Sequence, residues 1–196
     1  MPAKRIPLEI HTLTPARWDD FVTLFGANGA CGGCWCMAWR LPRADFVKGK
    51  GDGNKKAIQR LVKYGNVPGI LAYMDGQPVG WCSVAPRDEF PALGRSRVLK
   101  PVDNQPVWSV SCLFVASQFR GRGVSVELLK AAAEHAKKCG ATIVEGYPVE
   151  PYTERMPAAF AWTGLPAAFE KAGYKECARR SKTRPIMRKR VGQKKR

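Results

Sequence analysis

A glycine-rich turn is the segment of this sequence whose residue types and spacing are best suited to chemistry. It reads Gln-Phe-Arg-Gly-Arg-Gly-Val over residues 118–124, between an apolar, strand-like stretch at 107–115 and a helical pattern at 124–138. The first N–H groups of a helix have no partner inside the helix and lie at the positive end of its dipole, so such a turn binds anions, most often phosphate. Arg120 and Arg122 add charged donors. The turn therefore predicts a pyrophosphate-binding site.

Two well-known glycine loops have a different spacing. A P-loop needs four residues between its glycines, whereas one residue separates Gly121 from Gly123. A dinucleotide-binding turn needs a third glycine at the position of Val126. The pattern that remains is Gln/Arg-x-x-Gly-x-Gly, matched by Gln118, Gly121 and Gly123. It resembles the loop of the GCN5-related N-acetyltransferases that binds the pyrophosphate of acetyl-coenzyme A. The segment 167–174 is similar to the last helix of that family, and the resemblance extends over about residues 5–190.

The resemblance implies a fold and a cosubstrate. The fold is α/β (α+β), with a mixed, mostly antiparallel sheet, helices on both faces, and a central pair of strands (107–115 and 141–147) that splay apart. Acetyl-coenzyme A would give its acetyl group directly to a primary amine of a small-molecule or peptide acceptor, which the resemblance does not identify. Dimers are common in the family, so a homodimer is compatible with it. The motif places coenzyme binding at Leu113, Phe114, Val115, Gln118, Arg120, Gly121, Arg122, Gly123, Val124 and Ser125.

The acid and base groups of the family are less well matched. A glutamate on the strand before the loop corresponds to Ser109, and a tyrosine of the last helix corresponds to Phe169. Glu145, on the partner strand, is the carboxylate that the sequence places beside the splay, and it is our predicted catalytic residue. Because two family residues are replaced, a protein that binds coenzyme A without catalysis is the alternative.

The segment Cys31-Gly-Gly-Cys34-Trp35-Cys36 is the second unusual feature. A Cys-x-x-Cys pair suggests zinc, but the chain has no second pair, so we expect no metal. The resemblance puts this region at the wall of the acceptor pocket. The predicted pocket residues are therefore Trp35, Trp39 and Arg40, although the aromatic residues would also serve simply to close the core.

Composition indicates one globular domain with an uneven charge. The chain has 196 residues, 45% of them hydrophobic, and a net charge of +17. Ten of its lysines and arginines lie in residues 178–196, which contain no acid. We expect one domain over 1–190 and a solvated basic tail over 191–196. Nucleic acid is not the expected partner, but a basic nucleic-acid-binding protein is a second alternative. No apolar run is long enough for a membrane span, and the seven cysteines fit a reducing, cytoplasmic location.

Hydrophobic periodicity and turn residues predict the order of elements. Two irregular stretches, 85–106 and 148–164, interrupt that order. Strands are expected near 5–12, 69–74, 78–84, 107–115, 141–147 and 175–187, with a strand-like pattern also over 183–191, and helices are expected near 15–25, 54–64, 124–138 and 165–172.

Overall fold

A seven-stranded sheet forms the centre of the protein. The computed structural model describes residues 8–153 and 156–192, and the order of the strands is β1-β2-β3-β4-β5-β7-β6. Within the described residues, β4 and β5 pair in parallel and every other neighbouring pair is antiparallel. The mixed, mostly antiparallel sheet predicted from the sequence is confirmed. The strands are β1 (Glu9–Thr12), β2 (Gly69–Met74), β3 (Gln77–Pro86), β4 (Trp108–Val115), β5 (Ile143–Gly146), β6 (Lys175–Arg179) and β7 (Pro185–Arg190).

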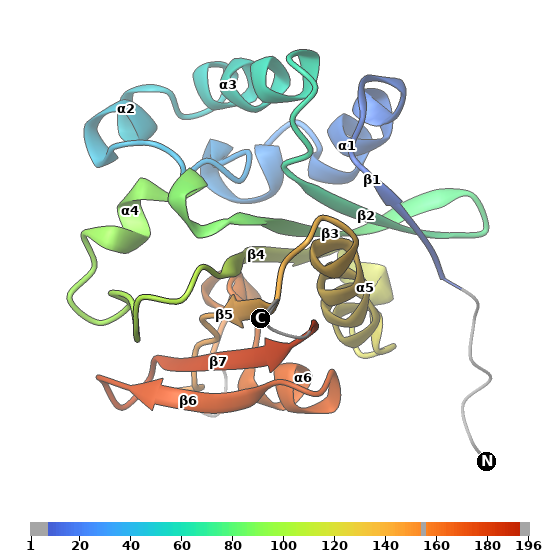
Figure 1. Ribbon diagram of the computed structural model, residues 1–196. Coiled ribbons are helices and arrows are strands. Elements are labelled where there is room, and N and C mark those ends of the chain that lie inside the picture. The colour runs from blue at the N-terminus through green and yellow to red at the C-terminus, as the bar shows by residue number, and fades with distance from the viewer. Residues whose placement is uncertain (1–7, 154–155, 193–196) are drawn as a thin grey trace.

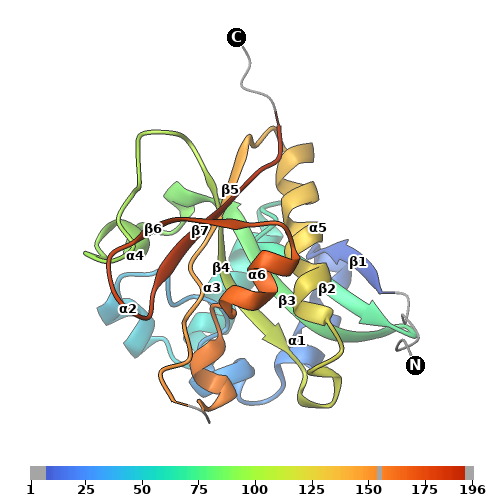
Figure 2. The same cartoon turned by 90° about the horizontal axis from the view of Figure 1, so that it is seen from below.

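Helices cover both faces of the sheet, as expected. One face carries α1 (Trp18–Phe25), α2 (Arg43–Lys48) and α3 (Asp52–Lys63), and the other carries α5 (Val124–Lys138) and α6 (Pro166–Lys171), which lie in front of the sheet in Figure 2. The short α4 (Pro91–Gly94) lies in the connection between β3 and β4 (Figure 1). Shorter helical turns are η1 (Pro15–Arg17), η2 (Gly29–Gly33), η3 (Arg87–Glu89), η4 (Ser117–Phe119) and η5 (Ala158–Ala161).

Local sequence explains the elements that position the site. β2 and β3 form a hairpin around Asp75 and Gly76, whose φ angles of 50° and 75° are both positive. Two positive φ angles in succession are the geometry of a tight hairpin turn, which Asp-Gly favours. Helix α5 packs Leu128, Leu129 and Ala132 into the core, and a glycine lies just outside each of its ends. These strong local signals are why the predicted bounds of this hairpin and helix agree closely with the structure.

The parallel strands β4 and β5 separate after a short pairing. They pair from Trp108↔Val144 to Val110↔Gly146, after which β5 ends while β4 continues to Val115. On the other edge of β4, the register with β3 shifts so that Ser111 has no Cα partner, which marks a β-bulge. The second half of β4 therefore has an edge that β5 does not cover. This is the splayed central pair that the resemblance implied.

Some expected boundaries were wrong. The predicted strand over 175–187 is two antiparallel strands, β6 and β7, because the polar residues 180–184 turn the chain, and β7 lies within the strand-like pattern noted over 183–191. The irregular stretch 85–106 contains η3 and α4, and the sequence analysis missed α2. Residues 5–7 of the first expected strand, and 193–196 of the expected basic tail, lie outside the described residues. In the part of the chain that the structure describes, no helix has the length and apolar character needed to cross a membrane.

Candidate functional site

The glycine turn has the geometry of an anion site. Gly121 and Gly123 have φ angles of 74° and 81°, a region that side-chain-bearing residues rarely adopt. Gly123 is the residue before α5, so the turn leads directly into the N-terminus of this helix. Within residues 8–153 and 156–192, no backbone or side-chain atom accepts from the N–H groups of residues 121–125. These N–H groups, at the positive end of the helix dipole, are free to bind phosphate oxygens.

The two arginines of the turn flank this helix end. The Arg120 Nε donates to the carbonyl oxygen of Val115 at 3.0 Å, which ties the turn to the last residue of β4. The Arg122 guanidinium lies 5.5 Å from the centre of the Phe119 ring. Gln118 accepts a hydrogen bond from Ser117 Oγ at 3.3 Å. The expected coenzyme-binding residues therefore lie on one continuous stretch of chain, from the splayed half of β4 to the first turn of α5.

Part of the splay is filled by the connection between β5 and α6. The backbone N–H of Leu113 donates to the carbonyl oxygen of Trp162 at 2.7 Å, and the N–H of Val149 donates to that of Gly164 at 3.0 Å. The Trp162 ring stacks on Trp39, with 5.7 Å between ring centres and 29° between ring planes. Trp162 thus reaches from the open edge of β4 to the segment where the sequence placed the acceptor pocket.

The structure separates the three residues predicted for the acceptor pocket. Trp35 is buried, with 3% of its surface exposed, and stacks on Phe25 at 5.5 Å between ring centres. It belongs to the core under α1, so the prediction that it lines an acceptor pocket does not fit its position. Trp39 contacts Trp162. Arg40 binds Glu89 at 2.5 Å and the Pro68 carbonyl at 3.2 Å, so its guanidinium is already paired.

A surface cavity of about 490 Å³ lies beside Arg40, between α3 and η3. Of the predicted acceptor residues, Arg40 alone belongs to its lining. The wall combines apolar side chains with two arginines and one acid. It consists of Met37, Arg40, Leu41, Ala57, Arg60, Leu61, Tyr64, Asn66 and Glu89.

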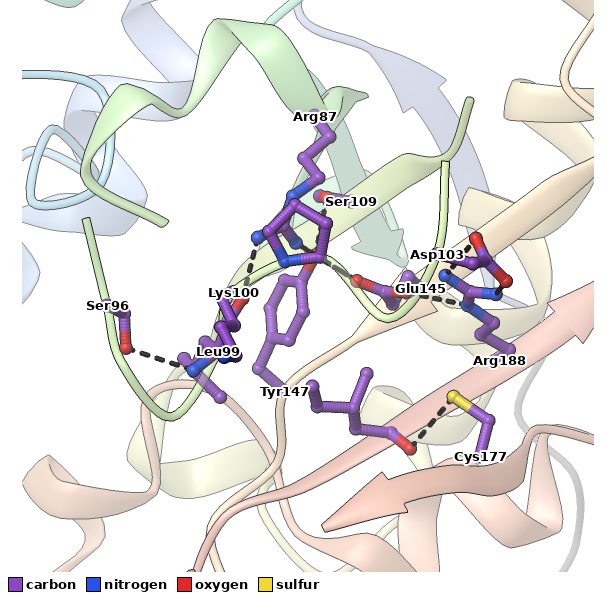
Figure 3. A network of polar contacts seen from close by, with 12 residues as sticks. Arg87, Ser96, Leu99, Lys100, Asp103, Ser109, Glu145, Tyr147, Cys177 and Arg188 are labelled. Carbon is purple, nitrogen blue, oxygen red and sulfur yellow. Dashed lines mark hydrogen bonds and ion pairs between the residues drawn. The ribbon is translucent and has the colours of Figure 1, made fainter. Parts of the chain in front are cut away.

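Glu145 lies at the centre of a buried polar network rather than in an open site (Figure 3). Its side chain is fully buried, and its two oxygens accept from Arg87 Nη1 at 3.0 Å and from Arg188 Nε at 2.6 Å. The Tyr147 hydroxyl donates to the same carboxylate at 2.8 Å and also contacts Arg87 and Ser109. Burial and the adjacent Glu145 raise the pKa of Tyr147.

This geometry does not favour the role of general base that we expected for Glu145. Its register partner is Ser109, within the stretch where β4 and β5 are still paired, so the side chain lies before the splay rather than inside it. Both oxygens are engaged by arginines, and water has no access. A base must reach the proton it abstracts, within about 3 Å or through one water. Glu145 is placed to hold η3, β5 and β7 together.

Arg87 and Arg188, together with Arg180, also bind the loop that follows α4. Arg87 Nη2 donates to the Leu99 carbonyl at 2.6 Å, and Arg180 donates to three further carbonyls of residues 98–101. Arg188 binds Asp103 through two nitrogens, at 2.6 and 3.2 Å. The hydrogen bonds from Arg188 hold the pKa of Asp103 well below its ordinary value. The network therefore links the loop to the sheet through charge.

We predict that Asp103 makes stability depend on pH in the acid range. A carboxyl whose pKa is lowered by folding stabilises the protein above its unfolded pKa of about 4, and this contribution is lost as pH falls below that value. Wild type should melt above Asp103→Asn at neutral pH, and the gap in Tm should narrow between about pH 5 and pH 2. Thermal melts across that range test this. A gap that stays constant with pH would show that the Asp103 charge is not responsible.

The cysteine segment shows structural contacts. The buried Cys36 sulfur accepts from Trp81 Nε1 at 3.1 Å, and the Cys34 thiol donates to the Gly29 carbonyl at 3.5 Å. Burial raises the pKa of Cys34, which makes its thiolate less available. No group of three or more potential metal-binding side chains occurs among the described residues. The contacts found for Cys34 and Cys36 are those of packed thiols.

Sequence reasoning missed Arg87, Arg188 and Trp162. Arg87 and Glu145 are 58 positions apart, and Arg188 is 43 positions from Glu145. No periodicity connects residues at such distances. Trp162 lies in an irregular connection, where only its large apolar side chain signalled that the segment must pack against something.

Comparison with known proteins gives a family and a fold. A sequence model of the Acetyltransferase (GNAT) family matches residues 35–157. No curated protein matches the sequence. A GNAT-family acetyltransferase from Streptococcus agalactiae is 17% identical, with a TM-score of 0.56, and the match covers 95% of this chain and 96% of that chain.

Two structures with coenzyme A ligands share the same fold. The PaiA N-acetyltransferase from Thermoplasma acidophilum, in complex with coenzyme A, is 15% identical with a TM-score of 0.51; the match covers 94% of this chain and 99% of that chain. YncA from Salmonella typhimurium, with its cofactor acetyl-CoA, is 12% identical with a TM-score of 0.52, and 95% of each chain is covered.

Proposed function

We propose, from the premise that this chain belongs to the GNAT family of acetyltransferases, that it transfers an acetyl group from acetyl-CoA directly to a primary amine. The observation that carries this proposal is the position of the glycine turn. It joins the open, splayed half of β4 to the N-terminus of α5, with Gly121 and Gly123 in the left-handed region. An extended arm that leads into a pyrophosphate, as the pantetheine arm of acetyl-CoA does, fits this arrangement.

The proposed coenzyme site uses mainly backbone groups. The N–H groups of residues 121–125, together with Arg120 and Arg122, would hold the pyrophosphate. The backbone of Leu113, Phe114 and Val115 would pair with the pantetheine chain, and Gln118, Val124 and Ser125 would flank it. That structures of the same fold were solved with coenzyme A and with acetyl-CoA supports this assignment.

Acetyl-CoA supplies an acyl group that is already activated as a thioester. The amine nitrogen bonds to the carbonyl carbon, the carbon–sulfur bond breaks, and the proton lost by the amine balances the thiolate that leaves. The chain's part is to align the thioester along β4 and to place a backbone N–H near Val115 against the carbonyl oxygen, where negative charge develops. We propose Glu145 as a positioning residue, because both of its oxygens are paired with arginines. No enzyme-bound acetyl intermediate is needed.

The proposed acceptor site lies beside Trp39 and Arg40. Of the predicted acceptor residues that remain, Trp39 stacks on Trp162 and Arg40 lines the surface cavity. A small-molecule or peptide amine is the proposed acceptor. We also propose a cytoplasmic location, which the seven free cysteines support because disulfides are rare there.

Titration of the purified protein with acetyl-CoA, ATP and NAD, followed by thermal melts, tests the proposal. Of the three ligands, we expect only acetyl-CoA to raise Tm, and to do so in a saturable way. A screen of primary amines should then find thiol release that depends on both substrates.

Two outcomes would favour the alternatives. Acetyl-CoA binding without thiol release for any amine would indicate a coenzyme-binding protein without catalysis. A rise in Tm with RNA that disappears steeply with salt, without one for acetyl-CoA, would indicate a nucleic-acid-binding protein.

A further inference from the structure

The connection between β5 and α6 takes the place beside β4 that β5 leaves open. β5 ends at Gly146, and the next partner of the β4 edge is the Trp162 carbonyl, which accepts from the Leu113 N–H at 2.7 Å. Gly164 follows and packs so closely that a Cβ there would lie 2.8 Å from both Leu113 Cδ1 and a carbon of the Phe169 ring. Residues 162–164 therefore fill the splay at Leu113.

Contacts on the opposite side hold this segment in place. The Trp162 ring stacks on Trp39, whose carbonyl accepts from the Ala92 N–H at 3.2 Å and which is thereby tied to α4. The Trp39 Nε1 is buried and has no acceptor among the described residues. A buried donor without a partner is costly, so the Trp39 Nε1 would gain from an acceptor. A ligand with an oxygen at this position would improve it.

We propose that residues 162–164 are a plug that acetyl-CoA must displace from β4, and that the Trp39–Trp162 stack couples this displacement to the acceptor side. The inference rests on the proposed function, in which the coenzyme pairs with Leu113–Val115. One amide N–H has a single hydrogen, so the Leu113 N–H cannot fully serve both the Trp162 carbonyl and a coenzyme oxygen. Withdrawal of the carbonyl pulls on the Trp162 ring and breaks the stack on Trp39.

The coupling between the acceptor side and the coenzyme site is expected to be positive. An acceptor that packs on Trp39 and accepts from its Nε1 competes with Trp162 for the same ring. Its binding releases the plug and exposes the Leu113 N–H. Because linkage is reciprocal, acceptor and acetyl-CoA bind with positive cooperativity. The plug thereby lowers the affinity for acetyl-CoA while the acceptor side is empty.

The test compares the affinity of acetyl-CoA for wild type, Trp162→Ala and Trp39→Leu by isothermal titration calorimetry. Both variants lose the stack but keep every residue of the glycine turn. We expect acetyl-CoA to bind them up to about ten-fold more tightly, since they lose the aromatic stack that holds the plug, which has roughly that value, and keep the backbone hydrogen bond that the coenzyme must displace. Phe160→Ala is the matched control, because Phe160 belongs to η5 but is 55% exposed, and its affinity should equal that of wild type.

Hydrogen exchange in the absence of coenzyme gives a second measurement. A peptide spanning 111–115 should exchange faster in both variants than in wild type, because the Leu113 N–H loses its acceptor more often. If Trp162→Ala does not fold, the affinity and the hydrogen exchange are both measured on Trp39→Leu. Unchanged or weaker affinity in a folded variant, beside a wild type that binds, would overturn the plug alone. Failure of wild type and variants alike to bind acetyl-CoA would overturn the proposed function and the plug with it.

Discussion

Gly121→Glu should lower the affinity for acetyl-CoA by about 100-fold or more. Gly121 has a φ angle of 74°, and a non-glycine residue there is strained by about 1–2 kcal/mol. The new carboxylate would also lie among the N–H groups of residues 121–125, where the pyrophosphate is proposed to bind. Repulsion between like charges at a binding site costs several kcal/mol. Calorimetric titration of wild type and variant measures the loss directly.

Gly140→Glu separates the loss of binding from backbone strain. Gly140 has a φ angle of 88° and follows the C-terminal end of α5, while Gly121 precedes its N-terminus. No atom lies within 4 Å of a Cβ placed at either glycine, so both substitutions bring the same strain and charge without a clash. Gly140→Glu should lose at least as much stability as Gly121→Glu, because its carboxylate lies at the negative end of the α5 dipole, but it should bind acetyl-CoA like wild type. If both variants lose affinity for acetyl-CoA equally, the loss comes from instability. If both keep the affinity of wild type, the coenzyme does not bind at this turn.

The elements that could be predicted from the sequence are those determined by neighbouring residues. The 3.6-residue periodicity of 124–138, with a glycine just outside each end, gave the bounds that α5 has in the structure. Asp75-Gly76 determined the β2–β3 hairpin in the same local way. The division of 175–187 into β6 and β7 was missed, because no glycine marks the turn and its polar residues, 180–184, are also acceptable in an edge strand.

In the candidate site, too, the features set by neighbouring residues could be predicted, and the long-range contacts could not. The glycine turn is continuous in sequence, so its chemistry and its place before α5 could be inferred before the structure. Glu145 was selected because it lies on the strand beside β4, but the arginines that bind its carboxylate come from η3 and β7. Sequence reasoning located its strand and could not show that Arg87 and Arg188 occupy its carboxylate. The contact of Trp162 with Leu113 is equally non-local, since the two residues are 49 positions apart in the sequence.

Glu145→Gln should destabilise the fold more than any surface substitution. The Glu145 side chain is fully buried, and its carboxylate is the shared partner of Arg87 and Arg188, whose side chains are each only 13% exposed. A neutral amide has about the same shape, but it removes the negative charge that Arg87 and Arg188, both mostly buried, share. Loss of one partner from a buried ion pair costs about 3–5 kcal/mol. Urea unfolding should show this as a lower midpoint with an unchanged slope.

Glu176→Gln is the matched control, because Glu176 pairs with Arg179 on the surface and the exposed fractions of the two side chains are 42% and 34%. Its unfolding midpoint should stay within error of wild type. The activity of the folded Glu145→Gln protein then distinguishes the two roles of Glu145. A positioning residue leaves the shape of the pH–rate profile intact, since the group that titrates in catalysis is still present. Wild-type stability combined with a loss of turnover of about 100-fold and of the acidic limb of that profile would instead identify Glu145 as the general base.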